Sequence, residues 1–278
     1  MLLVLSGSEA PYQTFAKAFS QNLPADIRVS TQQYPASLPG GGQAIDLIVT
    51  VGEKAADQVV PHTGRPVLAT MLPSFRYAGL AGNRPSGAEL SAIFVDQPWE
   101  RQVSLLRAAL PYRNKVGILL PPGTNWQTAQ LRKLLSERGA TLVTEVTDPS
   151  GTLSGDLERI LSRSDLLLAV PDNTIYNGSN IRDIILSSYR HGIPLVGLSQ
   201  AYVNAGALCA VFSTLEQLAV QTRAAVIAYA RSRQLPGPQY PDAYSIAVNR
   251  QVARSLEIEL PSLEAIRNQI DKTKGDGP

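Results

Sequence analysis

The chain has 278 residues, of which 44% are hydrophobic, and its formal net charge at pH 7 is +2. A chain of this length can bury a large core, either as one domain or as two lobes. Its Lys and Arg residues are scattered, so the sequence gives no indication of binding to nucleic acid or to a membrane surface.

Cysteine and histidine usage excludes several kinds of site. Cys209 is the one cysteine, so no internal disulfide can form, and its apolar neighbours predict a buried, unreactive thiol. His62 and His191 have no other His or Cys at ligand spacing, so we expect neither a metal nor a cofactor. No stretch is long and apolar enough to span a bilayer.

Short apolar runs alternate with segments of helical periodicity along almost the whole chain. Continuous apolar runs such as residues 166–170 are typical of parallel strands that are covered on both faces. The alternation predicts an α/β fold built from right-handed βαβ units with parallel sheets. The expected strands are residues 2–6, 27–32, 46–51, 66–71, 90–95, 115–120, 141–146, 165–170, 193–198, 207–212 and 244–248.

Two helices have clear boundary signals. Ser213 with Glu216 three residues later predicts a capping box at the start of a helix that ends before residues 236–238, Pro-Gly-Pro. Another helix is expected to begin at residues 96–98, and its periodicity places Trp99 on the core face.

The chain contains what looks like the same half-domain twice. Residues 2–5 are matched by 116–119, 46–52 by 165–171, and 64–69 by 192–197. Three matched segments in one order predict two similar α/β lobes in tandem. A cleft between two such lobes is a natural site for a small-molecule ligand.

Ligands of open parallel sheets bind outside the carboxyl ends of the strands. Helices begin just after these ends, so their free backbone N–H groups would suit a carboxylate or another anionic group. The polar residues could instead only cap helices or, at Asp172 and Asn173, form a turn. The candidate ligand-binding residues are Ser6, Ser8, Tyr12, Gly52, Glu53, Met71, Thr124, Asn125, Trp126, Asp172, Asn173 and Ser199.

Tyr12 and Trp126 occupy equivalent places in the repeat, one in each lobe. They could face each other as two plates around a ring or an aliphatic chain. They could equally pack on the helices of their own lobes, and the sequence leaves both possibilities open.

Motifs of known enzyme classes are incomplete in this chain. Residues 197–201, Gly-Leu-Ser-Gln-Ala, resemble a nucleophile elbow, but no His follows Ser199 to complete a triad. The chain has no GxxxxGK[ST] phosphate loop, and no GxGxxG follows the first strand. We therefore expect no catalytic residues.

The second half resembles the substrate-binding proteins of ABC transporters, in the family that includes aromatic amino-acid-binding members. The resemblance begins with Asp-Gln-Pro at residues 96–98 and continues through residues 101–119. It includes the Asp172-Asn173 turn and ends with residues 246–261, which are similar to the terminal signature of the family.

The chain departs from the family pattern at two places. It has Leu72-Pro73 where the family commonly has Asp-Pro, and Glu257 where the terminal signature usually has Gly. The first departure leaves the ligand class open, and the second falls at a helix end.

The resemblance implies a type I periplasmic-binding-protein architecture with two Rossmann-like lobes and three hinge crossings. We expect an N-terminal lobe of residues 1–95 and 214–240 and a C-terminal lobe of residues 96–213 and 248–278. Family members are exported, which favours a periplasmic protein whose leader has been replaced by Met1 over a cytoplasmic one.

The predicted function is that of a non-enzymatic, monomeric protein that closes around a small molecule and delivers it to an ABC permease. The ligand could be an amino acid or another small molecule with an apolar or aromatic part. A ligand-sensing subunit that presents its closed form to a signalling receptor is one alternative. An α/β transferase that uses the cleft between the lobes is another.

Overall fold

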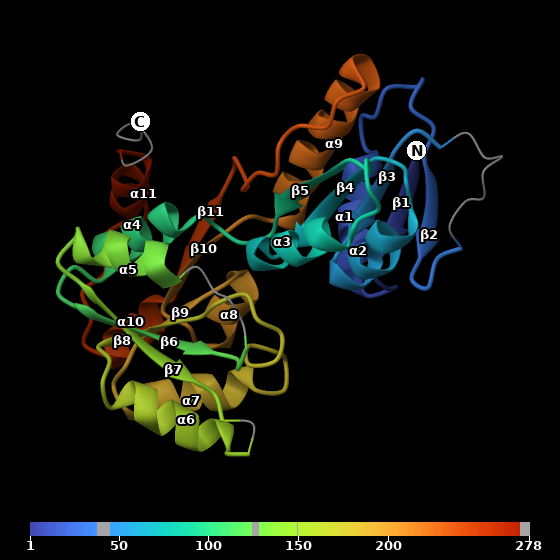
Figure 1. Ribbon diagram of the computed structural model, residues 1–278. Helices are drawn as coiled ribbons and strands as arrows, with labels where there is room; N and C mark the ends of the chain where they lie inside the picture. Colours follow the sequence, from blue (N-terminus) through green and yellow to red (C-terminus); the bar gives the residue numbers. More distant parts are fainter. Residues whose placement is uncertain (38–44, 124–127, 149, 273–278) are drawn as a thin grey trace. The chain divides into compact units, whose positions relative to one another are not determined.

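The computed structural model describes residues 1–37, 45–123, 128–148 and 150–272. It divides into two compact units (Figure 1). Unit 1 consists of Met1–Asp96 and Ser213–Tyr244, and unit 2 of Gln97–Phe212 and Ser245–Pro278. Each unit is built from helices and a largely parallel sheet, which confirms the predicted fold class.

The sheet of unit 1 has five strands in the order β2-β1-β3-β4-β5, and every neighbouring pair is parallel. Its central strands are apolar and buried along their whole length, as expected where helices cover both faces. The strands are β1 (Leu2–Leu5), β2 (Ser30–Gln33), β3 (Ile48–Val51), β4 (Val67–Leu72) and β5 (Leu90–Phe94).

Two helical layers cover the two faces of this sheet. On one face, strand residues share a buried cluster with Ala55 and Leu80 from α2 and α3. On the other face, a second cluster contains Phe15 of α1 and Leu218 of α9. The helices of unit 1 are α1 (Ala10–Ser20), α2 (Glu53–Val59), a 3-10 turn (Val60–His62), α3 (Ser74–Asn83) and α9 (Leu215–Ser232).

The capping box of α9 lies one residue later than predicted. The hydroxyl of Thr214 accepts a hydrogen bond from the backbone N–H of Gln217 at 3.2 Å, and Thr214 N–H donates to Oε1 of Gln217 at 2.8 Å. The expected pair, Ser213 with Glu216, is wrong because the Ser213 hydroxyl donates to the carbonyl oxygen of Ala243 instead. Thr followed by Gln satisfies the motif as well as Ser followed by Glu, so the sequence offered two registers.

The sheet of unit 2 has six strands in the order β7-β6-β8-β9-β10-β11, and only the β10–β11 pair is antiparallel. It contains β6 (Lys115–Leu120), β7 (Thr141–Val146), β8 (Leu166–Leu168), β9 (Leu195–Gly197), β10 (Cys209–Phe212) and β11 (Ser245–Val248). Strand for strand, β6 to β10 repeat the order of β1 to β5, which confirms the predicted repeat.

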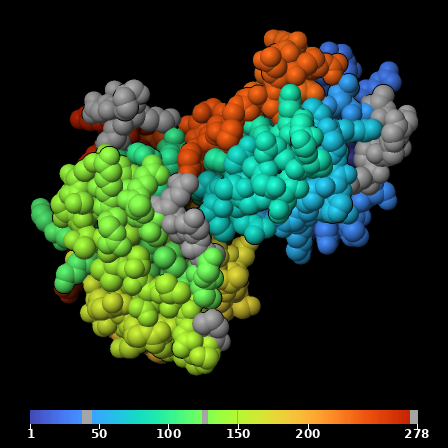
Figure 2. Space-filling view, in the orientation of Figure 1, coloured from blue at the N-terminus to red at the C-terminus, as the bar shows by residue number. Residues whose placement is uncertain are grey.

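Helices α5 and α6 are amphipathic and lie at the surface of unit 2, in green and yellow-green in Figure 2. Trp99, expected in the core, is only partly buried, because it is the first residue of α4 and precedes the buried stretch that begins at Arg101. The helices are α4 (Trp99–Ala109), α5 (Thr128–Ser136), α6 (Leu153–Leu161), α7 (Ile181–Arg190), α8 (Gln200–Ala205), α10 (Arg250–Ser255) and α11 (Leu263–Lys272).

Strand β7 forms one edge of the sheet of unit 2 and carries a charged cluster. Glu145 of this strand forms ion pairs with Arg159 at 2.6 Å and with Arg163 at 2.5 Å. Arg159 lies in α6 and Arg163 comes two residues after it, so the cluster links the edge strand to the helix that packs next to it.

Candidate functional site

The carboxyl ends of the parallel strands in unit 1 bring several predicted site residues to one edge of the sheet. Ser6 follows β1 and Gly52 follows β3, and these two strands are hydrogen-bonded neighbours. Met71 lies in the last part of β4, the next strand along, and Gly52 N–H donates to the carbonyl oxygen of Thr70 at 2.8 Å. The edge therefore places Ser6, Gly52 and Met71 on three adjacent strands.

Ser6 and Gly52 form a tight backbone arrangement. The buried hydroxyl of Ser6 accepts a hydrogen bond from the backbone N–H of Ala55 in α2 at 2.9 Å, so it supports α2 rather than capping the helix that follows it, α1. Gly52 has a φ of 89° and a ψ of 171°, a conformation nearly confined to glycine. A Cβ at Gly52 would lie 2.6 Å from the Ser6 hydroxyl oxygen.

Tyr12, in the first turns of α1, lies across this arrangement. Its Cε1 atom would be 2.9 Å from a Cβ at position 52, so the ring lies directly over the Gly52 backbone. Burial, followed by the negative charges of Glu9 and Glu53, raises the pKa of the Tyr12 hydroxyl, although its hydrogen bond with Ser6 acts in the opposite direction. The Tyr12 hydroxyl is therefore neutral at physiological pH, and it is surrounded by polar groups at the sheet edge.

Two further predicted residues at this edge have different environments. Glu53, the first residue of α2, forms an ion pair with Nε of Arg76 at 3.2 Å, and the same guanidinium contacts Asp57 at 2.9 Å. Ser8 is exposed, and it does not cap α1, because the N-cap residue of that helix is Glu9.

Asp96 is a residue of this edge that the sequence analysis did not select. Its carboxylate accepts hydrogen bonds from the backbone N–H of Ser74 at 2.7 Å and from the Ser74 hydroxyl at 2.6 Å. It thus caps the N-terminus of α3 from the end of β5. Burial raises the pKa of Asp96 above its ordinary value of 3.8, and the hydrogen bonds from Ser74 oppose this shift. A carboxylate placed 22 residues after the helix start gives no local sequence signal.

In unit 2, the segment that follows β8 is a turn organised by one carboxylate. Oδ1 of the buried Asp172 accepts hydrogen bonds from the backbone N–H groups of Thr174 at 2.9 Å and Ile175 at 3.0 Å, and from the Thr174 hydroxyl at 2.5 Å. No described residue is hydrogen-bonded to its other oxygen, Oδ2. Asn173 is exposed, and its carbonyl oxygen accepts from the side chain of Asn177.

Ser199 lies at the end of the neighbouring strand, β9, as the N-cap residue of α8. Its hydroxyl makes no capping hydrogen bond and is partly exposed. Three residues later, the Tyr202 hydroxyl donates to the carbonyl oxygen of Tyr176 at 2.7 Å, and burial raises the pKa of Tyr202 to about 12. Tyr176 is buried beneath the Asp172 turn, and burial raises its pKa as well. The sequence analysis did not select Tyr176, because an aromatic residue inside a turn carries no motif.

Three predicted site residues, Thr124, Asn125 and Trp126, lie outside the described residues. Their role in binding therefore stays a prediction, as does the pairing of Trp126 with Tyr12.

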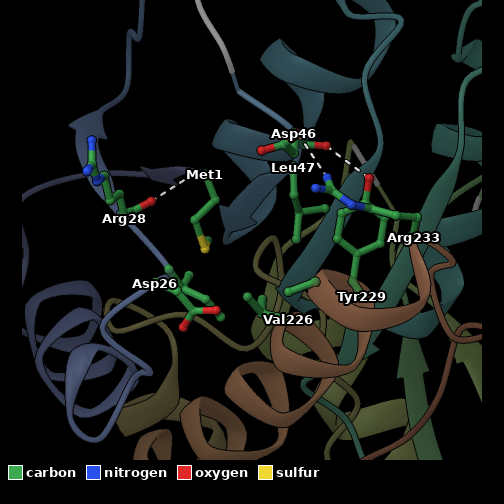
Figure 3. Close-up of a pocket in the computed structure, with 10 residues that line it drawn as sticks. Met1, Asp26, Arg28, Asp46, Leu47, Val226, Tyr229 and Arg233 are labelled. Atoms are coloured by element: carbon green, nitrogen blue, oxygen red, sulfur yellow. Dashed lines mark hydrogen bonds and ion pairs between the residues drawn. The ribbon is translucent and has the colours of Figure 1, made fainter.

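Unit 1 also has a cavity of about 300 Å³ (Figure 3). Met1 and Leu47, which line it, directly precede β1 and β3, so the cavity lies at the amino ends of the strands, opposite the edge that carries Ser6. Figure 3 shows Arg233 paired with Asp46 at 2.8 Å and the Tyr229 hydroxyl donating to the Asp46 carbonyl oxygen at 3.0 Å. We place the candidate site at the carboxyl ends instead, because ligands of open parallel sheets bind there.

The described parts of the chain offer little for other chemistries. Within them, no three His, Cys, Asp or Glu side chains come together to hold a metal ion. None of the helices in these parts has the length and apolar character that crossing a membrane requires. Cys209 is fully buried, as predicted, and burial raises the pKa of its thiol to about 12.

Comparison with solved structures identifies the fold. A domain from Streptococcus pneumoniae in complex with L-Trp shares 17% identity over 96% of this chain and 98% of its own, with a TM-score of 0.70. A conserved domain protein from Vibrio cholerae shares 20% identity over 96% and 97%, with a TM-score of 0.68. A ligand-free, open substrate-binding protein with adhesive properties from Clostridium difficile shares 17% identity over 95% and 96%, with a TM-score of 0.70. These likenesses support the type I periplasmic-binding-protein fold.

Sequence comparison identifies the family. No curated protein matches the sequence. The family described as ABC transporter substrate binding protein matches residues 41–270, well over half of the chain. The chain therefore belongs to the family of ABC transporter substrate-binding proteins.

Proposed function

We propose that this protein binds a small molecule with an apolar or aromatic part, such as an amino acid, and delivers it to an ABC permease. The observation that carries this proposal is the carboxyl edge of unit 1. There, Tyr12 and Met71 are apolar side chains that are only partly buried, next to the polar groups of Ser6 and Gly52. A mixed surface of this kind, at the carboxyl ends of parallel strands, is typical of ligand sites.

The ring of Tyr12 is the expected contact for the apolar part of the ligand. The ring is held over Gly52, so a ligand group can stack on it without first ordering a mobile side chain. The carboxyl edge of unit 2 carries polar groups that suit a polar part of a ligand. Oδ2 of Asp172 is an acceptor for an ammonium or hydroxyl group, and the Ser199 hydroxyl can donate or accept.

One of the similar structures supports an amino acid as the ligand. The similar domain from Streptococcus pneumoniae was solved in complex with L-Trp, and this ligand has both an aromatic group and an ammonium group. An aromatic amino acid would use the apolar ring surface of Tyr12 in unit 1.

The proposed mechanism is a shift between open and closed forms. The chain passes between the units at three places, at residues 96–97, 212–213 and 244–245, and we propose that these act as the hinge. Ligand binding favours the closed form, which the permease recognises. The protein acts outside the cytoplasm, as a monomer and without catalysis.

The test starts with the protein as purified. Native mass spectrometry identifies any ligand that is retained, and calorimetry with L-tryptophan and L-leucine measures affinity. Binding should raise the melting temperature by mass action and reduce the radius of gyration in solution scattering. The Tyr12→Ala variant should lose about tenfold or more in affinity, since burying a large apolar group contributes roughly 1.5–3 kcal/mol.

The matched control is Tyr112→Ala, because Tyr112 is 92% exposed and precedes β6, at the amino end of that strand. It should leave the affinity unchanged. If Tyr12→Ala bound both amino acids as tightly as the parent, Tyr12 would not be a ligand contact. If the parent bound neither amino acid and retained no small molecule, the proposed ligand class would be wrong.

A further inference from the structure

Met71 has an unusual backbone conformation for its place in the fold. Four described residues other than glycine have a positive φ, namely Asn22, Met71, Arg233 and Glu257. Three of them lie one or two residues after the end of a helix, where a left-handed residue commonly ends the helix. Met71, with a φ of 54°, lies inside β4. This conformation is unfavourable for a residue with a side chain, so the packing around Met71 must stabilise it.

The strand contains a bulge at the same residue. Thr70 pairs with Ile93 and Leu72 pairs with Phe94, so Met71 is an extra residue with no partner on β5. Bulges change the direction in which the following side chains point, and they are frequent next to functional sites.

The bulge determines which face of the sheet Met71 occupies. In β4, Val67 and Ala69 face the cluster under α2 and α3, whereas Leu68 faces the cluster under α1 and α9. Thr70 also faces α9, because its hydroxyl is hydrogen-bonded to that of Thr222. Strict alternation would send the next residue, Met71, into the α2–α3 core.

Instead, Met71 packs at the margin of the α1–α9 cluster, and Leu72 enters the α2–α3 core with 0% of its surface exposed. Met71 therefore stays partly exposed on the same face as Tyr12. The Tyr12 ring covers Gly52, and Gly52 is hydrogen-bonded to the residue before Met71. The Tyr12 ring, the Gly52 backbone and the Met71 side chain are therefore arranged in this order along the carboxyl ends of β3 and β4.

We propose that Met71 is a specificity-determining residue that selects ligands with an apolar side group and disfavours polar ones. This inference rests on the proposed function and deepens it. The thioether extends the apolar surface of Tyr12, and methionine makes favourable contacts with aromatic rings and adapts its shape to different groups. The protein should therefore accept both aromatic and aliphatic side groups, with a preference set by polarity rather than by shape.

The test compares two probes of similar shape, L-leucine and L-asparagine, with L-tryptophan as an aromatic probe. The parent should bind L-leucine more tightly than L-asparagine in calorimetric titrations. Met71→Gln keeps the unbranched chain and the same left-handed backbone but makes the side group polar. It should reduce the ratio of the two affinities by about tenfold or more, and weaken L-tryptophan similarly. Met71→Gly, which removes the side chain, should also weaken L-leucine and L-tryptophan.

Glu257→Gln is the matched control, because Glu257 has a φ of 53° and is exposed at the end of α10. This substitution should leave the affinities for L-leucine and L-asparagine unchanged. Melting curves of all variants verify folding. A parent that binds the probes and a Met71→Gln variant with the same leucine-to-asparagine ratio would overturn this inference alone. A parent that binds none of the three amino acids would overturn the proposed ligand class, and the inference with it.

Discussion

After β3, in unit 1, the chain turns through Gly52 with a φ of 89° and enters α2 at the next residue. At the matched position after β8, in unit 2, the residue is Pro171, whose ring restricts φ to about −65°. Unit 2 therefore continues into the turn organised by Asp172. Five strands of the two sheets have the same order, but one edge depends on a backbone conformation nearly confined to glycine and the other on a carboxylate.

The two units also differ in polarity at the next pair of matched strand ends, those of β4 and β9. Counted from the matched residues Ala69 and Gly197, Met71 in unit 1 corresponds to Ser199 in unit 2. An apolar side chain on a bulged strand thus has a hydroxyl as its counterpart. The repeated strand order therefore determines where side chains lie at the strand ends, whereas short local changes there determine whether these side chains are apolar or polar.

The largest expected effect is at the edge of unit 1. Gly52→Ala should lower the free energy of unfolding by about 2–3 kcal/mol or more, because the backbone conformation is nearly confined to glycine and the new Cβ meets Ser6 and Tyr12. Denaturant unfolding followed by fluorescence measures this change. Binding of L-tryptophan should weaken as well, since Tyr12 has to move.

Gly64→Ala serves as the comparison variant, because a Cβ at Gly64 would meet no atom within 4 Å. Its stability should change little. Equal stability of the Gly52→Ala and Gly64→Ala variants would show that the edge of unit 1 tolerates a side chain at position 52. The difference between Gly52 and Pro171 would then contribute nothing to the free energy of unfolding.

A somewhat smaller effect is expected at the edge of unit 2. Asp172→Ala removes an acceptor of three hydrogen bonds and leaves the buried backbone N–H of Ile175 without this partner, which should cost about 1–3 kcal/mol. Asp172→Asn retains an acceptor oxygen and should cost less. Chemical denaturation of both variants measures the difference. An Asp172→Ala protein as stable as the parent would mean that the turn forms without the carboxylate.

The smallest effect concerns Asp96, which has no counterpart in this comparison. Its pKa is raised in the folded protein, so the folded state binds a proton more tightly than the unfolded state does. The resulting stabilisation is fully present below the unfolded pKa and is lost as the pH rises through the folded pKa. Relative to Asp96→Asn, the parent should therefore gain stability as the pH falls toward about 4. A constant difference in the free energy of unfolding between the two proteins across this window would contradict the shift.

Much of the fold could be predicted from the sequence, because strands buried on both faces leave continuous apolar runs. The runs in β1, β3 and β8 are examples, and their repetition predicted the two matching strand orders. Local boundaries were harder to predict. The capping box moved from Ser213 to Thr214 because both positions satisfy the motif.

The site could be predicted only in part. The rule that ligands bind at the carboxyl ends of strands selected Ser6, Gly52 and Met71, which do lie at one edge. The bulge at Met71 could not be predicted, since it depends on pairing with a strand that follows more than 15 residues later. The contact between Asp96 and Ser74 could not be predicted either, because it joins residues 22 positions apart in the chain.

The ion pairs of β7 have a consequence for how the protein behaves at high concentration. An edge strand presents unpaired backbone groups to which a strand of another molecule can add. Glu145 and its partners Arg159 and Arg163 lie beside that edge, so an incoming strand would have to displace or bury charged groups. Ion pairs with exposed partners contribute little to the stability of a single molecule, and both arginine side chains are about half exposed. Their greater effect here is on solubility, because they make strand-to-strand aggregation along β7 unfavourable.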